Sequence, residues 1–316
     1  MLWTENRRNS GPPFRQYLAK IQLCLAPVIW VAAFIGALWG LPLFKNYLYF
    51  FAWWPLIFFL DSMLFLAAGE SWLFDKTRDF VRLAAWSVTV WLIFECFNLY
   101  LLNWRYIGIE PRMWVRWPGY ALAFATVLPV IFLTAQALKS KGFFRHYIGR
   151  PLELNAWQPV FLIVGSASLV LPVVFSHYAF PLIWLSFIFL LDPFNDLLSG
   201  DSLTRRWLRG ERQEHLCLLA AGLLCGLWWE LWNYPAAAKW IYTLPLLNFG
   251  KVFEMPVLGY LGFPVFALEC AVMYNFLLIL DNSMSSRARR LAWLGQAAFW
   301  AAIFWAIDAR TVLWFR

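Results

Sequence analysis

Three glutamates lie inside apolar stretches of this sequence, where a charged side chain is costly. Glu230 and Glu269 fall within residues 226–274, two apolar segments joined by an aromatic, proline-containing connection, and Glu95 falls in an earlier apolar stretch. A charge at the centre of a bilayer costs roughly 2.5–3.5 kcal/mol even on an insertion scale, and burial favours the neutral form of a carboxylic acid. A neutral buried acid can donate a proton to an apolar substrate or relay protons across a membrane. We therefore predict that Glu230, Glu269 and Glu95 are catalytic residues.

Glu95 and Glu230 share a local pattern, because an asparagine follows each of them three residues later. A helix places such residues on the same face, so Asn98 and Asn233 are predicted to lie beside these acids and to bind substrate. The same carboxyl–amide pairs can instead act as polar clamps between helices, and this alternative stays open. Glu269 has no acidic counterpart, and its alternative role is a neutral acid hydrogen-bonded to a neighbouring helix.

The pattern around Glu95 and Glu230 belongs to an internal repeat. Five matches occur in the same order in both copies, with an offset that grows from 131 to 140 residues. The matches are Asp61 with Asp192, Gly69-Glu70-Ser71 with Gly200-Asp201-Ser202, Glu95 with Glu230, Trp104-Arg-Tyr106 with Trp240-Ile-Tyr242, and Gly119-Tyr120 with Gly259-Tyr260. Each copy holds an even number of predicted spans, so both copies enter from the same side of the membrane. The repeat is therefore predicted to be parallel, about an axis along the membrane normal.

Aromatic residues gather around the acids of the second copy. The candidate substrate-binding residues there are Trp228, Trp229, Trp232, Trp240, Tyr242 and Tyr260, with Glu254 and Lys251 at the outer membrane edge. Aromatic faces stabilise a cation, and flat aromatic walls suit a polyene, quinone or prenyl chain. The alternative is that these aromatic residues belong to the belt that membrane proteins place at the lipid–water interface, which would account for Trp104, Tyr106, Trp114, Trp117, Trp240 and Tyr242.

The composition predicts an all-α, polytopic integral membrane protein. Hydrophobic residues make up 62% of the chain, charged residues only 14%, and the mean hydropathy is +0.60, whereas soluble domains average about 25% charged residues. Apolar runs long enough to cross a bilayer recur along the chain. Nine spans are expected, at about 21–41, 46–67, 82–102, 118–138, 158–177, 179–198, 215–234, 256–280 and 290–308. Seven or eight spans remain an alternative if one segment is re-entrant.

The spans divide the chain into five parts. These are a basic N-terminal segment (1–20), a first four-helix repeat (21–138), a basic linker (139–157), a second four-helix repeat that carries the site (158–280), and a loop with a ninth helix (281–316). Basic residues concentrate on one side of this layout: Arg7, Arg8, Arg15, Lys20, Lys76, Arg78, Arg82, Lys139, Lys141, Arg145, Arg150, Arg205, Arg206, Arg209, Arg212, Arg287, Arg289 and Arg290. The positive-inside bias then predicts a cytoplasmic N-terminus, in a bacterial inner membrane.

Several residues have structural roles as their first interpretation. Asp61 and Asp192 are expected to cap helix ends and to pair with nearby loop arginines. Gly222 and Gly226 are spaced to let two helices approach closely. The five cysteines form no CxxC pattern and the three histidines are scattered, so the sequence predicts neither a metal site nor a cofactor.

Three functions fit these observations. The first is an intramembrane enzyme that acts on a lipid or isoprenoid by proton transfer from a carboxylic acid in an aromatic-lined cavity. The second is a proton-coupled transporter or flippase of a lipophilic solute, and the third is a non-catalytic membrane subunit or assembly factor. The predicted partners are a membrane lipid or lipophilic small molecule, and a membrane protein or a second copy of the chain, but no nucleic acid.

Overall fold

The computed structural model describes residues 13–154 and 156–314. Within this part of the chain, nine helical segments are long and apolar enough to cross a membrane, so the predicted all-α polytopic class and the nine spans are confirmed. The first half comprises α1 (Pro13–Leu38), α2 (Pro42–Ala68), α3 (Thr77–Leu101), α4 (Met113–Phe124) and α5 (Val127–Ser140). The second half comprises α6 (Trp157–Val174), α7 (Ser176–Ala179), η1 (Phe180–Leu182), α8 (Ile183–Ser199), α9 (Leu203–Leu208), α10 (Gln213–Asn233), η2 (Val257–Leu261) and α11 (Gly262–Ser283). The last helix, α12, spans Ser286–Arg310.

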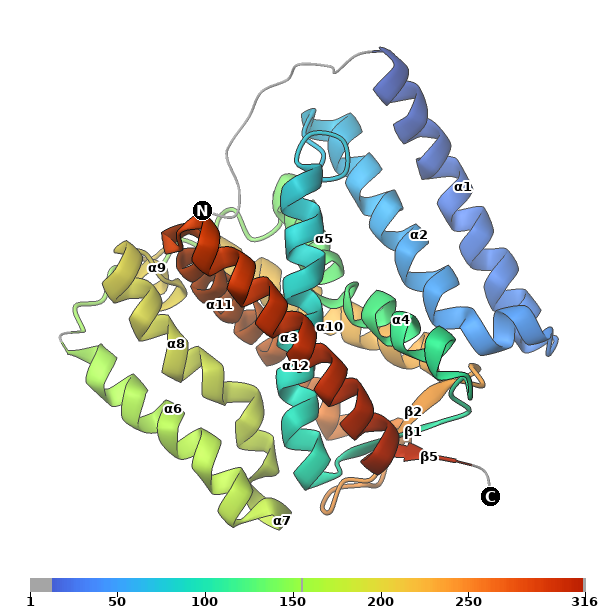
Figure 1. Ribbon diagram of the computed structural model, residues 1–316. Helices are drawn as coiled ribbons and strands as arrows, with labels where there is room; N and C mark the ends of the chain where they lie inside the picture. The colour runs from blue at the N-terminus through green and yellow to red at the C-terminus, as the bar shows by residue number, and fades with distance from the viewer. Residues whose placement is uncertain (1–12, 155, 315–316) are drawn as a thin grey trace.

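Two helical hairpins flank a central bundle. α1 packs along α2, and α6 packs along α8, as the short connections between these spans predict. Figure 1 shows the two hairpins on opposite sides, with α3, α5, α10 and α11 between them. The largest apolar core runs through α2, α3, α5, α10 and α11, so the residues of the internal repeat meet at the centre of the molecule.

Short strands close one end of the bundle. β1 (Trp104–Ile107) follows α3, and β2 (Lys239–Tyr242) follows α10. The two strands are antiparallel, with Trp104 opposite Tyr242 and Tyr106 opposite Trp240. Exchanging the two halves therefore reproduces the same pairs, which is the arrangement of a parallel repeat with a pseudo-twofold axis through the strand pair. β3 (Lys251–Val252) and β4 (Met255–Pro256) form a separate small hairpin.

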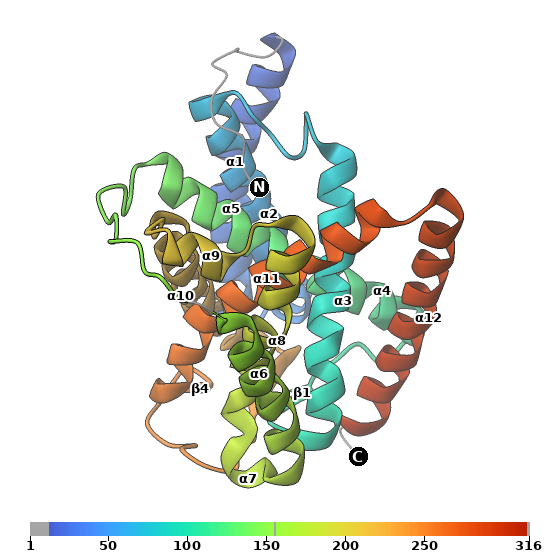
Figure 2. The same ribbon diagram turned by 90° about the vertical axis from the view of Figure 1, so that its left-hand side faces the viewer.

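α12 breaks the symmetry by packing mainly on the first half. It lies against α3 (Figure 2), and β5 (Val312–Leu313) adds to β1 in parallel. Asp308 of α12 accepts two hydrogen bonds from Arg116, at 2.8 and 2.6 Å, and one each from Trp117 and Tyr120, both at 2.9 Å. This ion pair, whose side chains are largely buried, fixes the C-terminal helix to α4. Because β5 pairs with β1 on the side away from β2, β1 is the central strand of the sheet and β2 is an edge strand.

The fourth span is interrupted between α4 and α5. Pro129 has no N–H group to continue the helical ladder, and the chain turns at Ala125 and Thr126. Ser87 of α3 bridges the break: its hydroxyl donates to the Phe124 carbonyl at 2.6 Å and accepts from the Leu128 N–H at 3.0 Å. The break turns α4 across the end of the bundle, where it covers the strands.

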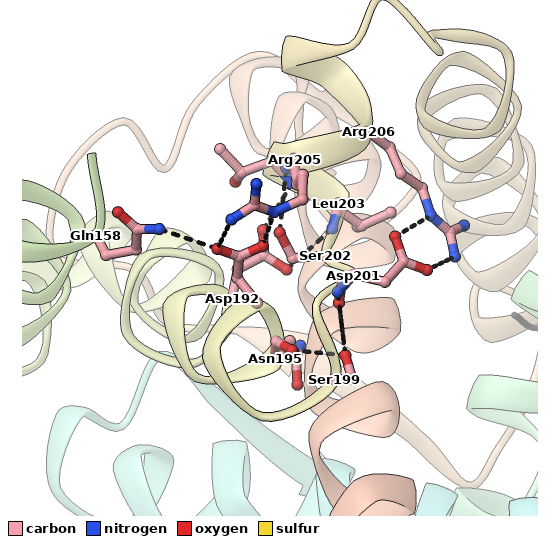
Figure 3. Close-up of polar contacts among 11 residues, drawn as sticks. Gln158, Asp192, Asn195, Ser199, Asp201, Ser202, Leu203, Arg205 and Arg206 are labelled. Carbon is pink, nitrogen blue, oxygen red and sulfur yellow. Dashed lines mark hydrogen bonds and ion pairs between the residues drawn. The ribbon is translucent and has the colours of Figure 1, made fainter. Parts of the chain in front are cut away.

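Asp61 and Asp192 hold backbone turns at the opposite end. Asp61 accepts from the Trp72 N–H at 2.7 Å and from the Ser71 hydroxyl at 2.5 Å. Asp192 accepts from the N–H groups of Leu203 and Thr204, at 3.2 and 2.7 Å (Figure 3). The predicted capping role is right, but the predicted pairing with loop arginines is wrong, because backbone N–H groups already satisfy both carboxyl groups.

Candidate functional site

A cavity of about 490 Å³ lies between the two halves, at the end of the bundle that the strands close. This volume falls in the usual range for small-molecule sites. The residues that line it are mostly aromatic or aliphatic and come from α2, α3, β1, α4, α5, η1, α8, α10, β2, β4, η2, α11 and the loops beside them. The aromatic members are Tyr47, Tyr49, Phe50, Trp91, Trp104, Tyr106, Tyr120, Phe124, Phe180, Trp184, Trp229, Trp240, Tyr242, Phe263 and Phe266.

The first half places a fully buried glutamate directly behind this lining. Glu95 Oε1 accepts from the indole N–H groups of Trp91 and Trp104, each at 3.0 Å, and from the Tyr106 hydroxyl. Asn98 holds the strand in place, because its amide bonds the carbonyl and the N–H of Trp104 at 3.0 and 3.1 Å. The Glu-x-x-Asn pattern therefore joins the end of α3 to the strand that follows it.

The second half repeats this arrangement residue by residue. Glu230 Oε1 accepts from Tyr242 at 2.8 Å and from the Trp240 indole at 3.3 Å. Asn233 bonds the carbonyl and the N–H of Trp240, at 2.8 and 3.0 Å. We call each set a Glu–Asn clamp: Glu95, Asn98, Trp104 and Tyr106 in the first half, and Glu230, Asn233, Trp240 and Tyr242 in the second.

In each clamp the tryptophan and the tyrosine line the cavity, whereas the glutamate lies behind them. Neither Glu95 nor Glu230 is among the lining residues, whereas Tyr106 and Tyr242 are. Burial, together with the neighbouring carboxyl group, raises the pKa of each tyrosine well above its ordinary value. Both hydroxyls therefore keep their protons and donate to the glutamates. The other carboxyl oxygen, Oε2, has no partner at either site.

Glu269 lies away from the cavity. It is fully buried in α11, and its Oε1 accepts from the backbone N–H of Phe187 in α8 at 2.8 Å. It is not among the lining residues. The structure thus gives Glu269 the contact with a neighbouring helix that the sequence left open as its alternative role.

The remaining predicted residues divide between the cavity and its surroundings. Trp229, Trp240 and Tyr242 line the cavity. Trp232 instead packs on Trp30 and Trp53 of the α1–α2 hairpin, with ring centroids 5.9 and 4.6 Å apart, and Trp228 stacks on Trp232. The Tyr260 hydroxyl bonds the Val252 carbonyl at 3.0 Å. Glu254 pairs with Lys239 at 2.6 Å, and Lys251 is exposed.

Trp104 and Tyr106 are buried inside the protein, which does not fit the interface-belt interpretation. Trp104 and Tyr106 are each only 7% exposed, and their polar atoms bond inside the protein. Sequence reasoning also missed Asn103, Trp91 and Trp184 as lining residues. For Trp91 a signal existed, because it lies one helical turn before Glu95 and on the same face.

Comparisons with protein-family models, with curated proteins and with solved structures find no match to this chain.

Proposed function

We propose that this protein is an intramembrane enzyme that acts on a lipid or isoprenoid substrate by proton transfer. The observation that carries the proposal is an apolar cavity bounded by two tyrosines, each hydrogen-bonded to a fully buried glutamate. Proton transfer by a positioned acid needs a donor within hydrogen-bonding reach of the substrate. Tyr106 and Tyr242 meet that condition for a molecule in the cavity, and Glu95 and Glu230 supply the proton store behind them.

Tyr242 and Glu230 are the pair that we assign to the reaction. In the resting arrangement the Tyr242 hydroxyl donates to Glu230. When Glu230 carries a proton, it donates to the phenol oxygen, and the phenol proton turns toward the cavity. A substrate double bond then takes the phenol proton while the phenol takes the proton of Glu230. The carbocation left on the substrate faces aromatic rings, which stabilise positive charge. It then loses a proton from another carbon to the Tyr242 oxygen, while the Tyr242 proton returns to Glu230, which restores the starting pair. The net change is an isomerisation or a cyclisation, which needs no oxidant or reductant.

The same geometry supports a second candidate function, a non-catalytic membrane subunit. The favouring observation is that the clamp residues satisfy one another: three donors converge on Glu95 Oε1, and Asn98 ties the strand to the helix. In this case the clamps hold in place the two strands whose pairing joins the halves, and the cavity holds a structural lipid.

Lipid and pigment extracts of expressing cells distinguish these functions. Extracts are compared for cells with the wild-type protein, Tyr242→Phe, Glu230→Gln, Glu269→Gln and no protein. The enzyme proposal predicts a lipid species that is present with the wild type and Glu269→Gln, and absent or at least about tenfold reduced with Tyr242→Phe and Glu230→Gln. Glutamine still accepts a hydrogen bond from Tyr242, so the Glu230 variant keeps the clamp but cannot supply an acidic proton. Identical extracts in all five cultures contradict the enzyme proposal and favour the subunit.

We also infer the orientation from charge. The basic residues at the end that holds Asp61 and Asp192 place that end in the cytoplasm by the positive-inside bias, and the strand end with the cavity on the other side. A bacterial inner membrane fits this arrangement. Reporter fusions after Ser140 and after Arg310 are expected to report opposite sides of the membrane, and a shared side contradicts the orientation.

A further inference from the structure

We infer that Asn103 binds a hydroxyl group, or another neutral hydrogen-bond donor, on the lipophilic molecule that occupies the cavity. This inference rests on the proposed function in one respect, namely that the cavity holds a small lipophilic ligand. It adds the polar feature by which that ligand is recognised and the residue that recognises it.

Asn103 lies in the wall of the cavity and has an unmet hydrogen-bonding need. It joins α3 to β1, just after Leu102, which has a left-handed backbone conformation. Its own carbonyl accepts from the Thr243 N–H at 2.8 Å, which fixes the backbone against the chain that follows β2. The side chain is 3% exposed, and its Oδ1 has no partner. Native proteins rarely leave a buried polar atom unpaired, because the cost is substantial.

Asn103 is distinctive among the residues that line the cavity. Among the described lining residues, no other has a fully buried side-chain polar atom without a partner. An amide oxygen is an acceptor only. The missing partner is therefore a donor such as an alcohol, and not an ether, an ester oxygen or a hydrocarbon.

The charged residues of the lining argue that this donor belongs to a neutral molecule. Arg116 is held by Asp308 at 2.6 Å, and Lys239 by Glu254 at 2.6 Å. These are the cationic residues of the cavity wall in the described part of the chain, and both are already paired inside the protein. A phosphate or diphosphate headgroup needs cationic partners that are free, so the wall suits an alcohol better than a phosphorylated lipid.

Asn103 also distinguishes the two halves of a pseudo-symmetric cavity. The residue before Trp104 is Asn103, whereas the residue before Trp240 is Lys239. The tryptophan and tyrosine that follow are the same in both halves, so the aromatic walls alone do not set the direction of an elongated ligand. A buried acceptor without a partner on one side gives the ligand one orientation, with its hydroxyl toward the first half.

The test uses a pair of polyene probes that differ in one donor. Purified full-length protein in lipid nanodiscs is titrated with retinol and with retinyl methyl ether, and binding is followed by energy transfer from the many tryptophans. The ether keeps the oxygen but has no proton to donate. The wild type is expected to bind retinol at least about tenfold more tightly than the ether, the discrimination typical of one buried hydrogen bond. Asn103→Leu is expected to bind both probes equally, and its binding of the ether shows that the variant is folded.

A second variant protects the test against misfolding of the first. Asn103→Asp keeps an oxygen acceptor at the same reach and is expected to retain the preference for retinol. Equal affinity of the wild type for the two probes overturns the Asn103 inference and leaves the proposed function standing. A wild-type protein that binds neither probe, and from which no lipid is extracted after purification, counts against the proposed function itself. Loss of the preference in Asn103→Asp while the wild type shows it also overturns the assigned role.

Discussion

The two Glu–Asn clamps have the same residues but different surroundings. In the first half a third donor, the Trp91 indole, reaches Glu95. The corresponding position in the second half is Gly226, and the Phe263 ring occupies the space beside it. Trp104 and Tyr106 are buried, whereas Trp240 and Tyr242 are half-buried. The same motif is thus enclosed in one half and more accessible in the other.

The difference originates outside the clamps themselves. β5, which follows α12, pairs with β1 on the side away from β2, while β2 is an edge strand of this sheet. An enclosed clamp suits a structural role, and a more open one suits a group that must meet a substrate. This comparison is why Tyr242 and Glu230, rather than Tyr106 and Glu95, carry the proposed reaction.

The largest effect is expected from removing the asparagines. Asn98→Ala deletes two hydrogen bonds and leaves the buried N–H and carbonyl of Trp104 unpaired, so it should lower the free energy of unfolding by about 2–4 kcal/mol. Asn233→Ala should cost roughly half as much, because water can reach the half-buried Trp240. Thermal unfolding in detergent measures both. Equal losses would remove the distinction between an enclosed and an open clamp.

Gly226 is the next position to test, since it makes room for Phe263 in the second half. A Cβ atom there overlaps the Phe263 side chain, so Gly226→Ala is expected to destabilise the protein by about 1–3 kcal/mol. Gly295→Ala in α12 is the matched control: no atom of another residue lies within 4 Å of the new Cβ atom, and alanine favours a helix. A stable Gly226 variant would show that the second clamp does not depend on this close packing.

Removing the third donor of the first clamp should have a smaller effect. Trp91→Phe keeps an aromatic ring against Phe124 and Phe266 but deletes the hydrogen bond to Glu95. A loss of about 1 kcal/mol is expected, since Trp104 and Tyr106 still donate. The lipid product should persist in the extract. Loss of product with unchanged stability would instead place the reaction at the first clamp.

The smallest effect is expected on stability at low pH, from an ion pair at the end of the molecule opposite the cavity. The Arg206 guanidinium, which forks onto Asp201 at 2.5 and 2.9 Å (Figure 3), holds the pKa of that carboxyl below its ordinary value of 3.8. A carboxyl with a lowered folded-state pKa contributes stability above its ordinary pKa and loses that contribution as the pH falls through the folded value.

Stability should therefore decline below about pH 4, and Asp201→Asn should remove part of this decline, by less than about 1 kcal/mol because the pair is partly exposed. Glu70→Gln is the matched control in the first half, where the ion pair with Lys76 is a single contact of 3.4 Å. Equal acid sensitivity of the two variants would contradict the assignment.

The sequence predicted the elements well because hydropathy and repetition are local signals. The number of spans, the hairpins and the matched Glu-x-x-Asn and Trp-x-Tyr segments could all be read along the chain. The boundaries were less accurate, since α1 begins at Pro13 and not at residue 21. Glu269 shows the limit: its apolar context predicted burial, but only the packing of α11 on α8 reveals the Phe187 N–H as its partner.

The arrangement of the cavity could not be predicted for a related reason. That Trp104 and Tyr106 turn inward depends on the pairing of β1 with β2 across the halves, and strand pairs this short carry no sequence pattern of their own. No motif in the sequence singles out Asn103, because the corresponding residue of the second half is Lys239. Its place in the cavity wall is seen only in the folded structure. The arginines near Asp61 and Asp192 led to a wrong prediction. Their charge suggested ion pairs with these two aspartates, but backbone N–H groups bond the carboxyl groups instead.

The register of β1 and β2 has a consequence for how such a molecule can be put together. An antiparallel pair that is unchanged when its strands are exchanged is the contact that two identical subunits make across a twofold axis, an isologous interface. The halves of this single chain therefore meet as the protomers of a homodimer do. Once two protomers are fused in this way they are free to diverge, so that β5 can pair with the strand of one clamp while the strand of the other stays at the sheet edge.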